Sequence, residues 1–310
     1  MDGVLIIDKP SGVTSHDVVA RTRHILHERR IGHTGTLDPF ATGVLVIVVG
    51  KATRLAQFLS DVDKEYEAII RLGYSTDTGD RTGNPIAGPP SHPRNWSEQE
   101  IETALQTFRG EIDQVPPMYS AKKVQGKKLY ELARRGESVE RKPVHVCIHK
   151  FEAIKPGGQL IKDNLDGTFD FEVRVACSAG TYVRTLAEDF GKRLNVGAHL
   201  AELRRTRVGD FPIHEARTLE QVKLSLAEEA LGTIMFNPDV ALSRLPFMDL
   251  TPDDLKRVGH GLNIRIDGAA WADGERVRLR DEHGHLVAVA QFNAAEGSLH
   301  PGVVMAAGTL

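Results

Sequence analysis

Apolar residues alternate or cluster along this chain in the ways that predict strands. The stretch VLVIVV, residues 44–49, is rich in β-branched side chains and ends at Gly50, which is typical of a buried strand. Other stretches combine β-branched or aromatic residues with partial alternation: residues 3–8, 63–76, 144–154 and 169–178. These patterns predict a sheet as the centre of the larger part of the chain.

Other segments place apolar residues three or four positions apart, which predicts amphipathic helices. Near the N-terminus, Thr14 or Ser15 would cap a helix that runs to residue 26. Ser97 and Glu100 have the spacing of a capping box, and Gly110 would close that helix. Further helices are expected at residues 51–60, 127–136, 181–194 and 218–231.

The strands do not alternate strictly with helices, as a doubly wound fold would require. We therefore expect an α+β domain with a mixed, mostly antiparallel sheet. The proline-bearing stretch 236–246 predicts a boundary between residues 1–245 and residues 246–310. In the smaller part, a hairpin at 277–292 with a His-Gly-His tip and further short strands predict a small β-barrel.

Composition narrows the class of protein. The chain has 310 residues, of which 41% are hydrophobic, enough for about two globular domains. It contains no apolar run of membrane-spanning length, and its N-terminus lacks the basic start of a secretory signal. Cys147 and Cys177 form no CxxC pair. We expect a cytoplasmic protein with no membrane partner.

Charge is unevenly distributed, although the net charge is only -3. Basic residues cluster in four segments: 21–30, 122–128, 134–142 and 204–207. Such clusters can build one positive face for a nucleic acid on a nearly neutral protein. The alternative is ordinary solvated surface.

Several short motifs fail closer inspection. VQGKKL lacks the glycine and the Ser/Thr of a phosphate-binding loop, and DTGDRTGN lacks the register of a calcium loop. His145, Cys147 and His149 alternate, so one strand face could offer them to zinc, but no fourth ligand has suitable spacing. GHTG matches the GxxG of a KH loop, which joins two helices, whereas a strand is predicted to follow here. We expect no metal and no cofactor.

Residues 31–45, IGHTGTLDPFATGVL, combine three glycines and three threonines with a single acid, Asp38. Glycines permit a tight path and close approach of a ligand to the backbone. Pro39 fixes the chain after the acid and biases Asp38 away from helical geometry. From the residues alone, this is either a reactive loop or a structural turn in which Asp38 caps a neighbour.

The segment GHTGTLDPFATGVL resembles the catalytic motif of the bacterial TruB-type tRNA pseudouridine synthases. Four more segments resemble motifs of that family in the same order: LIIDKPSGVTSHDVV, DKEYEAIIRLGYSTDTGDRTG, VPPMYSAKKVQGKKLYELAR and VACSAGTYVRTLAEDFG. Together they cover most of residues 1–210. The C-terminal part resembles the PUA-type RNA-binding barrel of bacterial members. The resemblance implies a catalytic domain of the pseudouridine-synthase type followed by a PUA-like domain.

The resemblance also implies an activity, the isomerisation of the uridine at position 55 in the tRNA T-loop. The family's essential acid falls on Asp38, the implied nucleophile. Attack at C1′, addition to the base and a glycal route all stay open. An adjacent guanidinium favours the ionised carboxylate, and the family pattern places it at Arg184. A flipped base needs an aromatic face, which the match assigns to Tyr66, also a candidate for proton transfer from C5.

The remaining matched residues are implied in binding. His33 would contact the T-loop, Tyr182 and Leu203 would line the pocket, and Lys9 and Pro10 would support the catalytic loop. Each of them could instead be ordinary core or structure. Lys122 and Lys127 would meet phosphates, so that binding weakens with salt.

The implied partner is the T-arm stem-loop of tRNA, bound by a monomer. A non-catalytic tRNA-binding or tRNA-folding protein on the same scaffold is the alternative. A glycoside hydrolase would need a second acid, which the loop does not supply.

Overall fold

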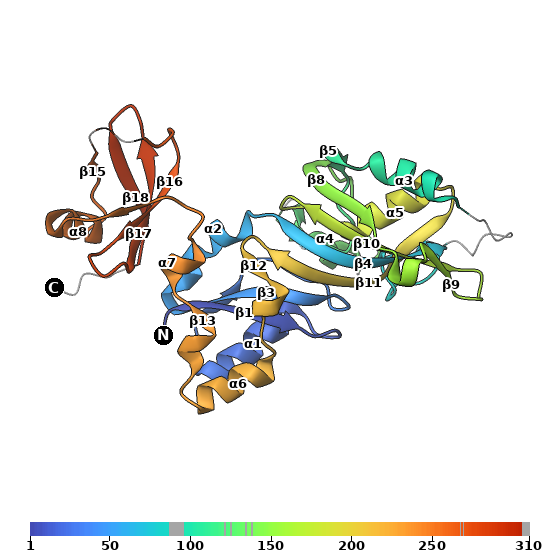
Figure 1. The fold of residues 1–310 in the computed structure, drawn as a ribbon, viewed down its shortest axis with the longest axis horizontal. Helices are drawn as coiled ribbons and strands as arrows, with labels where there is room; N and C mark the ends of the chain where they lie inside the picture. The colour runs from blue at the N-terminus through green and yellow to red at the C-terminus, as the bar shows by residue number, and fades with distance from the viewer. Residues whose placement is uncertain are drawn as a thin grey trace.

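A computed structural model describes residues 1–310 apart from 87–95, 121, 125, 134, 138, 267, 269 and 306–310. Its main body is an eleven-stranded sheet, and a second sheet of five strands forms a separate lobe (Figure 1). The central path of the main sheet runs in the order β13 (Met235–Phe236), β1 (Gly3–Lys9), β3 (Thr42–Val49), β11 (Gly197–Val208), β4 (Lys64–Gly73), β10 (Phe169–Cys177), β8 (Val144–Ala153) and β5 (Gly110–Gln114). Three short strands flank it: β2 (Ile31–His33), β9 (Ile161–Asp163) and β12 (Phe211–Pro212).

Within this sheet, β11 runs parallel to β3 and the other described pairings are antiparallel. The expected α+β class with a mixed, mostly antiparallel sheet is therefore confirmed. A small two-stranded sheet, β6 (Lys123–Val124) and β7 (Lys127–Lys128), stands apart from it.

The helices of the main body are α1 (Ser15–Leu26), α2 (Ala56–Ser60), α3 (Glu98–Gln106), α4 (Leu129–Ala133), α5 (Val183–Arg193), α6 (Leu219–Ala227) and α7 (Pro238–Ala241). Thr14 caps α1 and Ser97 caps α3, each through a complete capping box, as the sequence predicts. Helix α5 begins at Val183, after Tyr182, instead of near Thr181. In Figure 1, α3 and α5 lie together beside β8 and β10, whereas α1 and α6 lie beside β1 and β3.

Strand β4 shows how the sheet sorts its side chains. Every second residue from Lys64 through Tyr66 to Leu72 is buried, and those between are only partly buried. The buried face packs against α5 in a core that includes the stacked pair Phe171 and Phe190. This alternation places Lys64 and Tyr66 on the same face of β4.

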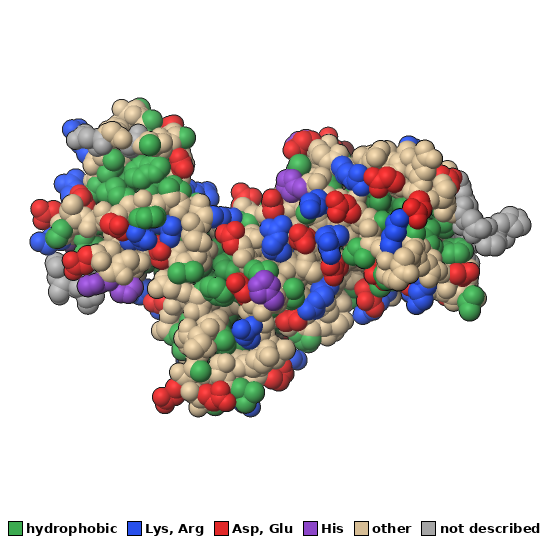
Figure 2. Space-filling model, in the orientation of Figure 1, with side chains coloured by type: hydrophobic (Ala, Val, Ile, Leu, Met, Phe, Trp, Pro, Cys, Tyr) green, Lys and Arg blue, Asp and Glu red, His purple; other side chains and the backbone are tan. Residues whose placement is uncertain are grey.

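The opposite face of β4, β10 and β11 carries interleaved acidic and basic side chains (Figure 2). They form cross-strand ion pairs: Arg71 with Asp170, Arg174 with Glu67, and Arg207 with Glu65. These paired charges explain why the sequence pattern does not predict β11 as one long strand, because its apolar positions are interrupted by Arg and Glu.

The smaller lobe contains β14 (Phe247–Asp249), β15 (Ile264–Arg265), β16 (Arg276–Arg280), β17 (Leu286–Asn293), β18 (Ser298–Val304) and helix α8 (Pro252–Gly259). Strands β16 and β17 form the expected hairpin. Leu286, Val289 and Val303 belong to the same apolar cluster as Phe58 of α2, so this lobe packs directly on the main body. No helix in the described ranges is long and apolar enough to cross a membrane.

Candidate active site

The loop between β2 and β3 carries Asp38, and side chains of Lys9 and Ser15 fix its backbone by hydrogen bonds. Lys9 is fully buried, and its Nζ donates to the carbonyls of Ala41 (2.7 Å), Pro10 (2.9 Å) and Pro39 (3.3 Å). Ser15 Oγ accepts from the amide of Leu37 at 2.9 Å and donates to its carbonyl at 3.1 Å. With both flanks of Asp38 tied to the N-terminal strand and α1, the acid is held by a rigid backbone.

Arg184, in the first turn of α5, grips the carboxylate of Asp38 with two nitrogens. Its Nε lies 2.9 Å from Oδ2, and its Nη2 donates to Oδ1 at 3.2 Å. The same guanidinium donates to the carbonyls of Tyr119 (2.6 Å) and Thr78 (2.8 Å). The Arg184 side chain is 6% exposed, whereas that of Asp38 is 31% exposed. A fork held this firmly leaves the carboxylate one orientation, with part of it open to a ligand.

Sequence reasoning missed a second acid beside this pair. Asp80 is 4% exposed, and its Oδ2 lies 3.8 Å from Nη1 of Arg184. Its Oδ1 accepts from Thr82 Oγ1 (2.6 Å), the Thr82 amide (2.9 Å) and Thr78 Oγ1 (3.0 Å). The sequence pattern of this segment suggests a calcium loop first; the signal that could have found Asp80 is an acid placed between threonines that can fix it.

Burial and the charges of Arg184 and Asp80 have the largest effects on the protonation of Asp38. Burial raises the pKa of Asp38 above its usual value; the charge of Arg184 opposes this rise, and the charge of Asp80 adds to it. Arg184 was expected to favour the ionised form, and it acts in that direction, but burial outweighs it. The carboxylate of Asp38 is therefore more basic than that of an ordinary aspartate.

Asp38 opens into a cavity of about 310 Å³, within the size range of ligand sites. Its lining includes every predicted catalytic residue and both predicted pocket residues: Asp38, Tyr66, Arg184, Tyr182 and Leu203. Tyr182 is pinned by Gln114, whose Oε1 accepts from its amide at 2.7 Å and whose Nε2 donates to its carbonyl at 3.1 Å. Burial raises the pKa of Tyr66 and of Tyr182, so both phenols stay protonated at neutral pH. Three distant segments of the chain thus converge on one acid.

The other predicted binding residues lie outside the cavity lining. His33 ends β2, next to the lining residue Thr34; its Nδ1 is buried and has no partner in the described structure. Burial lowers the pKa of His33 to about 4, so its ring is neutral at physiological pH. Pro10 is exposed, Lys122 is half-buried and Lys127 is exposed. The two lysines belong to the same segment as Ser120, which does reach the cavity.

The structure shows the surroundings of two charged clusters that the sequence singled out. His145 pairs with Glu111 and Asp113, and His149 pairs with Asp63, each at 3.1 Å. Within the described ranges, no group of three or more His, Cys, Asp or Glu residues could hold a metal ion. The cluster 204–207 is not a free positive patch, because Arg204 pairs with Asp8 at 2.7 Å, Arg207 pairs with Glu65, and Arg205 is buried.

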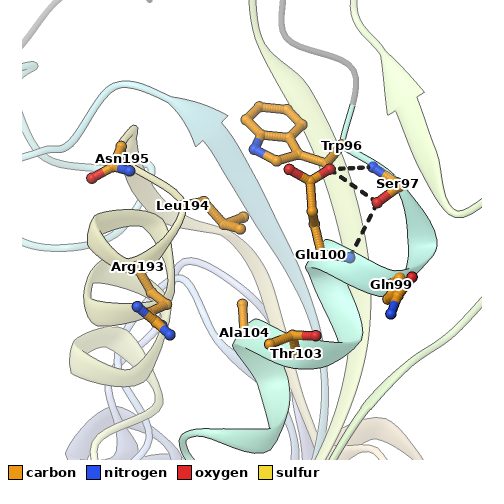
Figure 3. Close-up of a pocket in the computed structure, with 9 residues that line it drawn as sticks. All are labelled: Trp96, Ser97, Gln99, Glu100, Thr103, Ala104, Arg193, Leu194 and Asn195. Atoms are coloured by element: carbon orange, nitrogen blue, oxygen red, sulfur yellow. Dashed lines mark hydrogen bonds between the residues drawn. The ribbon is translucent and has the colours of Figure 1, made fainter.

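A second cavity, of about 370 Å³, lies between α3 and the end of α5 (Figure 3). Its lining residues include Trp96, Glu100 and Arg193. Glu100 is already engaged in the capping box of α3, accepting from the amide and hydroxyl of Ser97. The acid that lines this cavity, Glu100, is engaged in capping α3. We therefore assign the candidate site to the cavity of Asp38.

The chain matches known proteins over nearly its whole length. Residues 23–183 match the N-terminal domain of the TruB family pseudouridylate synthases, and residues 184–243 match the tRNA pseudouridylate synthase B C-terminal domain. The chain is 44% identical over 306 residues to tRNA pseudouridine synthase B of Thermobifida fusca, covering 98% of this chain and 99% of that protein. It is 43% identical over 302 residues to the protein of the same name from Geobacillus thermodenitrificans, covering 97% and 98%.

Solved structures are similar over nearly the whole chain. The crystal structure of a Cbf5-Nop10-Gar1 complex matches with a TM-score of 0.75 and 28% identity, covering 98% of this chain and 85% of that one. An archaeal box H/ACA sRNP Nop10-Cbf5 complex matches with a TM-score of 0.72 and 26% identity, covering 99% and 88%. The match extends across both sheets of the present structure.

Proposed function

The chain belongs to the TruB family of pseudouridylate synthases and isomerises uridine in tRNA, and we propose that it acts on position 55 of the T-loop with Asp38 as nucleophile. The observation that carries the assignment of Asp38 is its two-point contact with Arg184 at the cavity shared with Tyr66. Asp38 is the single carboxylate among the described residues that line this cavity.

The chemistry is an internal exchange of bonds. The N1–C1′ glycosidic bond breaks, the base turns, C5 bonds to C1′, and the proton of C5 leaves while N1 gains one. In this proposal the ionised carboxylate of Asp38 forms a bond to the nucleotide that breaks again as the product forms, which regenerates the carboxylate, and Arg184 holds it in the reactive orientation. Its raised pKa makes the carboxylate a stronger base and nucleophile, provided that the pH keeps it ionised.

A uridine in a folded T-loop has to leave its stack to reach Asp38. Tyr66 and Leu203 would receive the everted base, because both are buried and line the cavity beside the acid. The phenol of Tyr66 is the candidate to assist the loss of the C5 proton. Burial raises the pKa of Tyr66, so its phenol is protonated before the nucleotide binds and would have to give up its own proton in order to take that of C5.

We further propose that His33 contacts the T-loop near the cavity entrance, and that Lys122 and Lys127 meet phosphates of the T-arm. Residues 246–310 would form a PUA-like RNA-binding domain, with the boundary just before β14. The five-stranded sheet supports this assignment. Two unpaired cysteines, Cys147 and Cys177, support a reducing cytoplasm as the place of action.

A carbodiimide-based pseudouridine assay on an unmodified tRNA transcript tests the proposal. The wild type should modify position 55, and Asp38→Asn should give no product while still binding the tRNA. The exposed residue Lys223, on α6, supplies a matched control, since Lys223→Gln should keep full activity. Modification at another position would refute the T-loop assignment, and product from Asp38→Asn would refute the nucleophile. Release of free uracil would indicate hydrolysis instead.

A further inference from the structure

Two buried cations, Arg205 and Lys64, line the same cavity as Asp38. Arg205 is 2% exposed; its Nε donates to the carbonyl of Val44 at 2.7 Å and its Nη2 to that of Gly35 at 3.1 Å. Lys64 is 8% exposed, and its Nζ donates to the carbonyls of Val62 (2.6 Å) and Ser60 (2.8 Å). Both residues line the cavity. In the part of the chain that the structure describes, neither forms an ion pair with a carboxylate.

The strand register brings these two cations to one face. Arg205 is the cross-strand partner of Tyr66, and Lys64 lies two residues before Tyr66 on the buried face of β4. The two positive charges are close enough that Arg205 contributes to lowering the pKa of Lys64, which burial brings down to about 8. Lys64 is thus still mostly protonated at neutral pH, next to a guanidinium that is always charged.

The charges on the cavity lining do not cancel. Among the described residues that line it, the cations are Lys64, Arg184 and Arg205, and the single carboxylate is Asp38. An uncompensated buried charge is costly, and a bound anion removes that cost. The carbonyl contacts of Lys64 use two of its three donors, so one is left for a ligand.

We propose that Lys64 and Arg205 form a subsite for the backbone phosphodiester that flanks the everted uridine. This inference rests on the proposed function, because it assigns the nucleotide's phosphate to one wall and its base and sugar to Tyr66 and Asp38. Phosphodiester oxygens accept charge-assisted hydrogen bonds from ammonium and guanidinium groups. The subsite would hold the nucleotide in the everted state, and the bond exchange would occur at Asp38.

The test removes a charge either from a phosphate of the RNA or from Lys64. T-arm stem-loop RNAs carry one neutral methylphosphonate, either 5′ or 3′ of the target uridine. Single-turnover kinetics then give the half-saturating enzyme concentration and the limiting rate for the wild type and for Lys64→Met. We expect one of the two linkages to raise the half-saturating concentration of the wild type about tenfold, the scale of one charge-assisted hydrogen bond.

Lys64→Met should raise that concentration by a similar factor on native RNA and show little further loss with the neutral linkage. Its salt dependence should also be weaker, by about one unit in the log–log slope. Lys64→Arg should restore both, and Lys223→Met should respond to the neutral linkage as the wild type does. Circular dichroism confirms that each variant is folded.

The comparison of the two neutral linkages with native RNA needs only the wild-type protein. If neither neutral linkage weakens the wild type, the subsite is wrong. It is also wrong if Lys64→Met loses as much affinity with the neutral linkage as the wild type does, because the two changes would then act independently. A wild type that forms no pseudouridine in native RNA would instead overturn the proposed function, so the two failures are distinguishable.

Discussion

Nε of Arg184 lies 2.9 Å from Oδ2 of Asp38, and Nη2 donates to Oδ1 at 3.2 Å. The same side chain also binds two backbone carbonyls, Thr78 and Tyr119, from segments that are far apart in sequence. A single guanidinium therefore orients the acid and ties together the walls around it. A fork of fixed planar geometry can do both, which a flexible ammonium group cannot.

Arg184→Lys should accordingly keep the positive charge and lose the orientation. We expect the limiting rate of pseudouridine formation to fall on the order of 100-fold, the cost of a small misplacement of a reacting group. Single-turnover assays on a tRNA transcript measure it. Arg193→Lys, at the other end of α5, is the matched control and should stay within about twofold of the wild type. A rate for Arg184→Lys close to that of the wild type would show that charge alone suffices.

The pH dependence of the reaction should report the environment of Asp38. Because burial and Asp80 raise its pKa, the reactive carboxylate is lost as pH falls through a value above the ordinary range near 3.8. The acidic limb of kcat/KM should therefore lie above that range. Asp80→Asn removes the like charge, so this limb should move to lower pH. A limb near 4 in the wild type, or an upward shift in Asp80→Asn, would contradict this account.

Much of this arrangement was predictable because it depends on local patterns. The capping boxes of α1 and α3 and the hairpin of β16 and β17 follow from residues close together in sequence. The grouping of Asp38, Tyr66 and Arg184 came from the family resemblance, since no periodicity links a loop, a strand and a helix. Asp80 and Arg205 were missed because their importance arises from burial beside distant partners, which a single sequence does not display.

Gly43 should be nearly irreplaceable for a reason of space. It has φ +101°, and a Cβ there would lie 2.2 Å from the carbonyl oxygen of Arg205, where β3 runs parallel to β11. Gly43→Ala should displace β3 from β11 and with it the loop that carries Asp38. We expect it to be destabilised by several kcal/mol, well beyond the roughly 1–2 kcal/mol of left-handed strain alone.

Gly12 is a suitable comparison, because it has φ +85° and open space at the point where a Cβ would stand. Gly12→Ala should cost only the backbone strain. Urea unfolding of both variants measures the difference. Equal losses in the two variants would show that the close approach of β3 to Arg205 is not what requires glycine.

The two lobes should be coupled through a buried ion pair. Nη1 of Arg278, on β16, lies 2.7 Å from Oδ2 of Asp239, on α7, and both side chains are nearly buried. Arg278 Nε also donates to the carbonyl of Leu245 at 3.0 Å. Arg278→Met leaves the carboxylate of Asp239 buried, with only the more distant Arg280 at 3.9 Å, so unfolding should be easier by about 3 kcal/mol.

The double variant Arg278→Met/Asp239→Leu separates the cost of an orphaned charge from the loss of an attraction. With both charges gone, the contact becomes apolar and joins the neighbouring cluster of Leu242 and Ala241. Urea unfolding should therefore find the double variant more stable than Arg278→Met alone, since buried ion pairs often exchange for apolar groups at little cost. If the double variant were the less stable of the two, the attraction between Arg278 and Asp239, and not the burial of charge, would be what holds β16 against α7.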